Sequence, residues 1–478
     1  MEEFRETIIA ADLVHLPFTG CPFTWHNCSE GSRSLWKRLD RMLVNEMWLV
    51  KWPQASYLAA LPSTSDHSPL VILGTASNKN PTPFRFDNFL AEQPGFLDSV
   101  KHIWRHQING TSMYGVICKL KRLKTIFRAQ RKAKGDLADN ARKAKAFLDI
   151  AQALFDSYKE DYLLSLVQCC RLVYCAAIKI ENSMLQQRAK LRWLKNGDQC
   201  MKVFFRKINT RRATRRVFQI STKSGQLLTD MPQVTAEFVS FFQNLLGGIR
   251  RRRELDLNFL QSGLKHVLTR EEGEGLIAPV TMAEIKEAFF DISVESAPGP
   301  DGYPSLFFKA AWPEIGVEVC DAVTEFFQSG RLLKQINAML LTLIPKVQLP
   351  LCVLDYRPIS CCNVIYKAIT KIIVKRMQRV LHLLINYSQN AFVPGRSISD
   401  NILLAQELLA GYNQSKLPSR CTIKIDIQKA YDSVEWDFLL EGLRGTVQSV
   451  KVIKEALAEF ATMSGLQVSP GKSQIILS

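Results

Sequence analysis

The order of apolar and polar positions divides the 478-residue chain into three parts. The first holds short alternating runs, rich in Trp and Pro, that predict strands at 21–27, 39–44 and 65–72. From about residue 86 to residue 246, apolar residues recur at helical spacing. Linker-like stretches at 77–84 and 247–275 follow the first and second parts. We therefore expect an α+β protein with domains at 1–76, 77–274 and 275–478.

The third part contains the most sharply patterned elements. Its periodicity predicts a strand at 338–344, a Pro/Gly-rich turn at 297–302, and helices at 282–292, 304–311, 316–328 and 364–384. Further along, the sequence predicts a strand at 421–427, a helix start at 430–440 and a helix at 447–463. Asp426 lies inside that last strand, between Ile425 and Ile427. A carboxylate with such neighbours is costly to bury unless it is paired or binds a metal.

The net charge of +17, from 62 Lys and Arg against 45 Asp and Glu, indicates nucleic acid or another anionic surface as a partner. The excess is local, because residues 119–145 hold eleven basic residues against two acids, and residues 188–216 hold eleven against one. Trp193, Phe204 and Phe205 lie among the second set, as in grooves on which bases stack. A solvated basic helical bundle is the alternative interpretation.

We expect contacts to RNA and DNA from the second basic stretch. The candidate residues are Arg188, Lys190, Arg192, Lys195, Arg206, Lys207, Arg211, Arg212, Arg215 and Arg216. The twelve cysteines form no C-x-x-C pair and none has a histidine at zinc-site spacing, which favours free thiols in a reducing compartment. No uninterrupted apolar stretch approaches the roughly 20 residues of a membrane span, so no membrane partner is expected. No protein partner can be inferred.

Five segments occur in an order and spacing that resemble the reverse transcriptase of LINE-type non-LTR retrotransposons, especially those abundant in plants. They are Ala297–Gly302, Leu343–Lys346, Asp355–Ser360, Gln389–Arg396 and Lys424–Trp436. The resemblance covers about residues 275–478 directly, and the basic middle is similar to the region before the polymerase in the same elements. It implies a right-hand polymerase with fingers and palm that uses Mg²⁺, acts on RNA and DNA, and works in the nucleus.

The resemblance also implies roles for individual side chains. Asp426 would bind Mg²⁺, and Lys472 would donate a proton to pyrophosphate. Tyr431 would lie under the sugar of the incoming nucleotide, while Arg357 and Lys367 would grip its triphosphate, since an Arg fork suits phosphate oxygens. The substrate-binding set that follows is Arg357, Lys367, Tyr431 and Arg396.

The chain departs from this family between Asp426 and Lys472. Two-metal phosphoryl transfer needs acidic ligands from at least two positions, and family members place an Asp-Asp hairpin between these two motifs. No Asp-Asp dipeptide occurs in the chain, and only 45 residues separate Asp426 from Lys472. We interpret this as an internal deletion near Gly445–Thr446, expect no thumb after Ser478, and expect no polymerase activity. The alternatives are a non-catalytic nucleic-acid-binding protein and an active polymerase whose missing motifs lie outside this sequence.

The first part of the chain resembles a different fold, one found in nucleases. Ser65-Asp66-His67 is similar to the closing motif of the endonuclease/exonuclease/phosphatase sandwich, in which the His is a general base and the Asp orients it. Phe23–Trp25 and Arg38–Asp40 fit the preceding strands of that fold. The family's metal-binding Glu and its Asp-x-Asn strand are absent. The resemblance therefore implies a remnant without nuclease activity, with Asp66 and His67 as its candidate catalytic residues.

Overall fold

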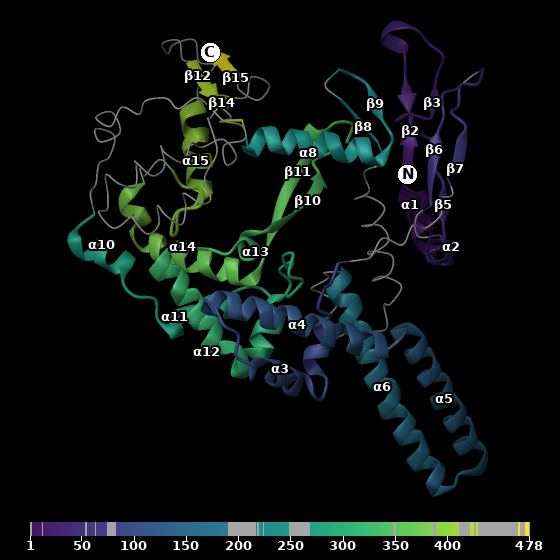
Figure 1. Ribbon diagram of the computed structural model, residues 1–478. Helices are drawn as coiled ribbons and strands as arrows, with labels where there is room; N and C mark the ends of the chain where they lie inside the picture. The colour runs from purple at the N-terminus through teal and green to yellow at the C-terminus, as the bar shows by residue number, and fades with distance from the viewer. Residues whose placement is uncertain are drawn as a thin grey trace.

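A computed structural model shows a protein of mixed helices and short strands (Figure 1). The residues that it describes are 2–11, 13–52, 55–62, 64–73, 83–189, 217, 219–222, 224–247, 268–347, 350–385, 389–410, 421–424, 427–428, 467–468 and 474–477. This mixture agrees with the α+β class predicted from the sequence.

The N-terminal residues form a small β-rich region. In its three-stranded sheet, β6 lies between β2, to which it runs parallel, and β7, to which it runs antiparallel. Strand β1 pairs with β5, and β3 pairs with β4. Leu16, Ala55 and Tyr57 are buried at the centre of this region. The elements are α1 (Glu2–Ala10), β1 (Val14–His15), β2 (Phe18–Gly20), β3 (Trp25–His26), η1 (Gly31–Arg33), β4 (Trp36–Lys37), β5 (Leu43–Val44), α2 (Glu46–Lys51), β6 (Ser56–Ala59) and β7 (Leu70–Leu73).

The largest apolar core joins helices that are far apart in the sequence. Phe86 and Phe127 from the basic middle part pack against Tyr303 and Phe307, with ring centroids 5.0 Å apart for Phe86–Phe127 and 5.3 Å apart for Phe86–Phe307. Residues on both sides of the domain boundary predicted at 274/275 therefore share one core. The helices involved are η2 (Asn88–Glu92), α3 (Phe96–Trp104), α4 (Ser112–Ala133), α11 (Met282–Phe290), α12 (Ser305–Ser329), α13 (Lys334–Asn337) and α14 (Val364–Leu384).

Helix α12 corrects the prediction of two separate helices in this part of the chain. It continues through Pro313, although proline inside a helix costs about 3 kcal/mol. Ala311 and Ile315, on either side of the proline, are fully buried. Burial of this apolar face therefore outweighs the local cost of the proline. Helix α14, by contrast, has the bounds that the sequence predicts.

The Pro/Gly-rich turn joins the basic middle part to the start of α14. The backbone N–H of Asp301 donates to Oδ1 of Asn363, the residue before α14, at 3.2 Å. On the other side, the N–H of Phe86 donates to the carbonyl of Gly302 at 3.0 Å. Gly302 has a φ of +80°, and a Cβ at this position would overlap the carbonyl oxygen of Phe84. The turn therefore needs glycine for its conformation and for this close approach.

Helices α5 (Leu137–Tyr158) and α6 (Asp161–Ala189) form an antiparallel hairpin that extends away from the other helices in Figure 1. Leu148 and Ala151 of α5 pack against Val167 of α6. By length and composition alone, residues Asp161–Arg188 could cross a membrane. No membrane-spanning segment was expected from the sequence, because charged and polar residues interrupt the apolar stretches of the chain. One such helix is weak support for a membrane span, and α6 has α5 packed along it.

A second, smaller core lies beside a two-stranded ribbon. Strands β10 and β11 pair antiparallel over seven residues, and Tyr356 of β11 packs edge-on against Phe238 of α8. The elements here are β8 (Ile220–Ser221), β9 (Leu227–Leu228), α8 (Met231–Gly247), β10 (Met339–Pro345), η3 (Val353–Asp355) and β11 (Tyr356–Cys362). The remaining elements are α10 (Arg270–Ile277), α15 (Ile398–Leu409), β12 (Cys421–Lys424), β13 (Ile427–Gln428), β14 (Gln467–Val468) and β15 (Gln474–Leu477).

Candidate functional site

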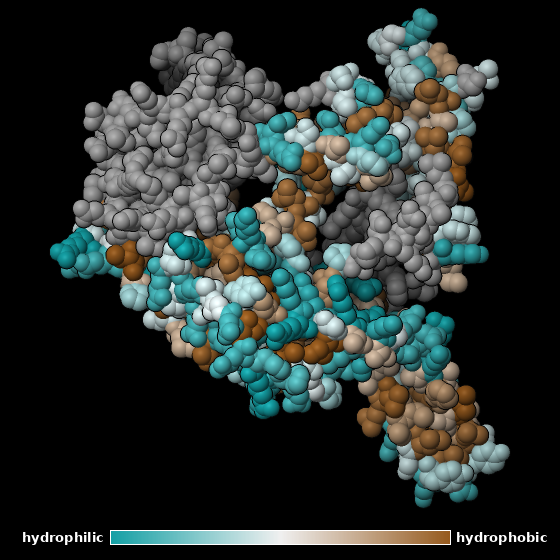
Figure 2. All heavy atoms as spheres, in the orientation of Figure 1, coloured by the Kyte–Doolittle hydropathy of each residue, from teal (hydrophilic) through white to brown (hydrophobic). Residues whose placement is uncertain are grey.

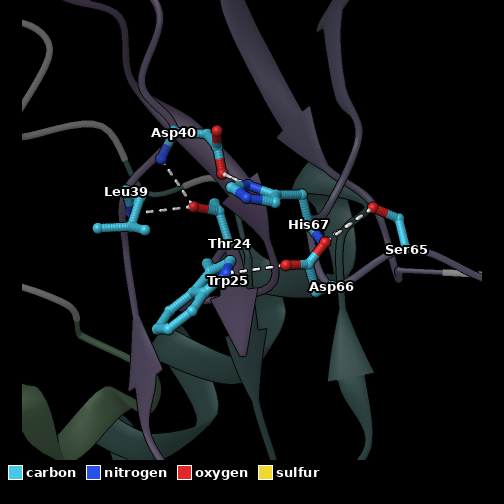
Figure 3. A network of polar contacts seen from close by, with 7 residues as sticks. All are labelled: Thr24, Trp25, Leu39, Asp40, Ser65, Asp66 and His67. Carbon is cyan, nitrogen blue, oxygen red and sulfur yellow. Dashed lines mark hydrogen bonds and ion pairs between the residues drawn. The ribbon is translucent and has the colours of Figure 1, made fainter. Parts of the chain in front are cut away.

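His67 and Asp40 form a hydrogen-bonded pair in the N-terminal region (Figure 3). Nδ1 of His67 lies 2.8 Å from Oδ2 of Asp40. The buried Thr24 holds Asp40 in place, because its hydroxyl accepts hydrogen bonds from the backbone N–H groups of Leu39, at 3.1 Å, and Asp40, at 2.9 Å. With the proton on Nδ1 facing Asp40, the neutral imidazole presents Nε2 as an acceptor. This is the arrangement that a general base requires.

Asp66 does not orient His67, as was expected from the sequence, but has a different partner. Its Oδ2 accepts a hydrogen bond from Nε1 of Trp25 at 3.0 Å, and its backbone carbonyl accepts from the N–H of His26 at 3.0 Å. The carboxylate that orients His67 is therefore Asp40 rather than Asp66. Asp66 lies in a bend, whereas His67 forms an isolated β-bridge with Trp25, and the two side chains have different neighbours. Asp40 was noted only as part of a strand, although the Arg38–Asp40 motif already contained it.

The two members of the pair stabilise each other's charged form. The hydrogen bond that His67 donates to Asp40 raises the pKa of His67 above its usual range. Burial alone would raise the pKa of Asp40, but the hydrogen bonds from His67 and Thr24 hold it below its usual range. His67 is thus shifted toward the imidazolium.

A divalent metal, which the polymerase and nuclease resemblances both imply, finds no ligand set among the described residues. In those parts of the chain, no group of three or more His, Cys, Asp and Glu side chains is arranged to hold a metal ion. Asp426, the predicted Mg²⁺ ligand, lies outside them. The described residues therefore do not fit such a metal.

Arg357 and Lys367, predicted to grip one triphosphate, lie apart. Arg357 is exposed on β11 and pairs across the ribbon with Ile344. Six positions of nearly extended chain, or roughly 20 Å, separate it from Asn363 at the start of α14. Lys367 is half-buried in the first turn of α14, where its Nζ donates to Oγ of Ser296 at 2.9 Å and to the carbonyl of Ala297 at 2.5 Å. Burial lowers the pKa of Lys367. The structure therefore uses Lys367 to anchor the Pro/Gly-rich turn.

Arg396 also serves a local structural purpose. Its guanidinium donates to the carbonyls of Gln389 at 2.8 Å, Ile385 at 2.9 Å and His382 at 3.2 Å. These carbonyls lie at the end of α14 and in the loop that follows it. Arg396 thus closes the loop on the helix end, and a phosphate would have to compete with these bonds.

The first basic stretch, residues 119–145, is less exposed than its composition suggests. Nζ of Lys119 is buried and lies 2.6 Å from a carboxylate oxygen of Glu318. Arg131 pairs with Asp87 at 3.2 Å. Other basic residues of this stretch remain exposed, among them Lys121, Arg122, Arg128, Lys132, Lys134 and Lys145. Part of the excess charge therefore stabilises the fold, and part is available to an anionic ligand.

Most residues of the second basic stretch lie outside the described part of the chain. Arg188, at the end of α6, is described and exposed. Burial raises the pKa of Asp87, and the positive charge of Arg188 opposes that rise. The residues of this set that are not described are Lys190, Arg192, Lys195, Arg206, Lys207, Arg211, Arg212, Arg215 and Arg216.

Tyr431 and Lys472 lie outside the described residues as well, but the strands that flank the Asp426 and Lys472 motifs are described. Strand β12, before Asp426, pairs antiparallel with β15, which follows Lys472. Strand β13, after Asp426, pairs antiparallel with β14, which precedes Lys472. Two strand ladders therefore bring together the segments on either side of the two motifs.

Comparisons with known proteins agree with this layout. Residues 344–457 match the family described as Reverse transcriptase (RNA-dependent DNA polymerase). The chain is 26% identical over 458 residues to the Transposon TX1 uncharacterized 149 kDa protein of Xenopus laevis, a match covering 92% of this chain and 34% of that protein. It is 26% identical over 182 residues to the Retrovirus-related Pol polyprotein from type-1 retrotransposable element R2 of Nasonia vitripennis, covering 38% of this chain and 17% of that one.

The family match contains most of the predicted polymerase residues, namely Arg357, Lys367, Arg396, Asp426 and Tyr431. The TX1 match continues through the basic middle part and into the N-terminal region, since it covers 92% of the chain. The chain spans about a third of the length of that relative. The resemblance to plant elements stays a prediction. The chain therefore contains a reverse-transcriptase-like segment and is similar to proteins of non-LTR retrotransposons.

Proposed function

We propose that this chain binds RNA and DNA through its basic helical part but does not copy an RNA template. The pairing of β13 with β14 is the observation that supports the proposed lack of RNA copying. In family members, an Asp-Asp hairpin lies between the two motifs that these strands border; here the described strand after Asp426 pairs directly with the described strand before the Lys472 motif. Because the sequence also contains no Asp-Asp dipeptide, Asp426 would lack the second carboxylate set that two-metal transfer needs.

We also propose the finer domain assignment. Residues 1–76 would derive from the last strands of an endonuclease/exonuclease/phosphatase-type sandwich, 77–274 from the basic connector, and 275–478 from the fingers and an incomplete palm. The Asp40–His67 pair supports the first assignment. The largest apolar core, which joins residues from both sides of position 274, supports a change to the assignment of 77–274. In this changed assignment, α3 and α4 of the connector fold as part of the fingers.

The non-catalytic binding function rests on charge. The exposed basic residues of 119–145, together with those of 188–216, would neutralise several phosphates, and each contact releases counterions. Log affinity should therefore fall with log salt by about 0.7–0.9 for each phosphate contact. Fluorescence anisotropy of the full chain with single-stranded RNA, measured over a salt series, tests this.

A matched pair of variants separates specific contacts from overall charge. Replacing Arg211, Arg212, Arg215 and Arg216 with Gln should flatten the salt slope by about 2–4. Replacing the four-arginine run Arg250–Arg253 with Gln removes the same number of charges from another part of the sequence, and the slope should change less. An equal change in both variants, or no binding by the wild-type chain at low salt, would contradict the proposal.

Nuclease activity is the second candidate function, and we propose that the chain lacks it. The Asp40–His67 pair has a base-like geometry, but the described residues place no acidic cluster beside it. Incubation of the 478-residue chain with supercoiled plasmid and Mg²⁺ should give no nicked product above the level of His67→Ala. Nicking that disappears in His67→Ala and in Asp40→Ala would show that the pair is active.

A further inference from the structure

The hairpin of α5 and α6 has an internal seam and a second apolar stripe. The seam consists of residues that face the partner helix. Leu148 and Ala151 on α5 and Leu163 and Val167 on α6 are buried in it, and Phe155 on α5 and Tyr174 on α6 are partly buried in it. The stripe consists of residues that each precede a seam residue by one position. They are Phe147, Ile150 and Leu154 on α5, and Tyr162, Leu166 and Val173 on α6. Their side chains are 40–68% exposed.

Helix geometry puts both halves of this stripe on one face. A residue one position before the seam is rotated by about 100° from it. In two antiparallel helices that face each other, this rotation turns both sets of side chains toward the same side of the hairpin. Figure 2 shows apolar residues gathered over the hairpin, at the end that extends from the rest of the protein. The stripe is therefore one continuous apolar face.

The opposite face of the hairpin is polar. The positions one after the seam carry Asp149, Gln152 and Asp156 on α5, and Gln168 and Arg171 on α6. Leu164 is the apolar exception among them. This division into one charged and one uncharged face is the pattern of a helix pair that is covered on one side.

We propose that the apolar stripe packs against the same stripe of a second copy of this chain, so that two hairpins form a four-helix arrangement. With 40–68% of each side chain exposed, the two aromatic and four aliphatic residues together expose roughly 600 Å² per copy. A two-fold pair would bury about 1,200 Å², which reaches the lower end of the range for stable interfaces. A face without charges is also self-complementary, as a two-fold contact requires.

A bilayer fits this face less well. Helices that lie on membranes carry Lys and Arg on their polar face, whereas the polar face of α5 near the tip carries Asp149 and Asp156. A spanning α6 would place Arg171 within the hydrocarbon region, and the tip, with Glu160 and Asp161, would have to cross it. A second copy requires neither.

Sedimentation equilibrium of the full chain tests the proposal. The wild-type chain should be a dimer at micromolar concentration. The pair Ile150→Lys and Val173→Lys places unpaired charges in the stripe and should raise the dimer Kd at least about 100-fold. The matched pair Gln152→Lys and Gln168→Lys adds the same charge on the polar face and should leave the Kd within about threefold of the wild-type value.

Helical circular dichroism should be unchanged in both variants, since the substituted side chains are solvent-accessible. If the lysine pair loses helicity, Ile150→Gln with Val173→Gln repeats the test without adding charge. A monomeric wild-type chain, or a dimer that responds equally to both pairs, overturns the proposal. So does a wild-type chain that stays monomeric but floats with phosphatidylcholine vesicles through the same stripe.

Discussion

Nζ of Lys119 on α4 lies 2.6 Å from a carboxylate oxygen of Glu318 on α12, and the same ammonium donates to the carbonyl of Trp104 at 2.9 Å. The two partners are 199 positions apart in the sequence. One belongs to the basic connector and the other to the reverse-transcriptase part. The pair shows that these parts are joined by a buried ionic contact as well as by apolar packing.

Removing Glu318 and removing Lys119 should lower the free energy of unfolding by different amounts. Glu318→Ala leaves the Lys119 ammonium buried without a counter-ion, at a cost of about 3–5 kcal/mol in the free energy of unfolding. Lys119→Met leaves a carboxylate that is 39% exposed and can be hydrated, so we expect about 1–2 kcal/mol. Urea unfolding measures both, with the exposed Lys121→Met as a near-neutral control. A larger loss in Lys119→Met would contradict this explanation.

Gly302 should tolerate no side chain. Its φ of +80° and the overlap of a Cβ with the carbonyl of Phe84 add to each other, so Gly302→Ala should cost at least about 3 kcal/mol. Gly225 has a similar φ of +83°, but a Cβ there meets nothing within 4 Å. Gly225→Ala should therefore cost only about 1 kcal/mol. Similar thermal shifts for the two variants would show that the contact with Phe84 has no energetic importance.

The titration of Asp301 should make the free energy of unfolding decrease as pH rises through the mildly acidic range. Burial raises its pKa from 3.8 to about 6. Between these values the unfolded chain has released a proton that the folded chain retains, so the free energy of unfolding decreases with pH, by up to about 3 kcal/mol. Asp301→Asn keeps an acceptor for the N–H of Tyr303 and should remove this decrease.

The control for the pH series is Asp291→Asn. The hydrogen bond from Lys375 lowers the pKa of Asp291, so its stabilising contribution is present above the unfolded pKa and is lost as pH falls. The two variants should therefore change the pH slope of unfolding in opposite directions. A shared direction would show that the raised pKa of Asp301 is wrong.

His67 should titrate above the usual histidine range because of Asp40. Asp40→Ala removes the acceptor of the hydrogen bond that is the largest cause of the raised pKa and should return the pKa toward 6.5. Asp66 contributes a smaller electrostatic effect, so Asp66→Asn should lower the pKa less. NMR titration of the His67 ring protons measures both. A larger drop in Asp66→Asn would restore Asp66 as the orienting residue.

The sequence predicted the elements whose pattern is local. Helix α14 has the predicted bounds because its apolar face repeats without interruption from Val364 to Leu384. The division of α12 was wrong because Pro313 is a strong local signal, and the packing that overrides it comes from distant helices.

Pairings between distant residues could not be predicted from the sequence. Asp40 is 27 positions from His67, and their meeting depends on how the short N-terminal strands pair. Lys119 was counted in the local charge excess, because a charge count along the chain contains no information about its pairing with Glu318. Lys367 and Arg396 were assigned to substrate binding from a motif resemblance alone, whereas the structure gives their charges backbone carbonyl partners.

We propose that the chain holds RNA without copying it, and primer extension on a saturated complex is the decisive measurement. The full chain is titrated onto a labelled primer–RNA duplex until anisotropy shows complete binding, and nucleotides with Mg²⁺ or Mn²⁺ are then added. We expect a saturated complex and no extension above background. Extension that disappears in Asp426→Ala but persists in the neighbouring control Asp432→Ala would contradict it.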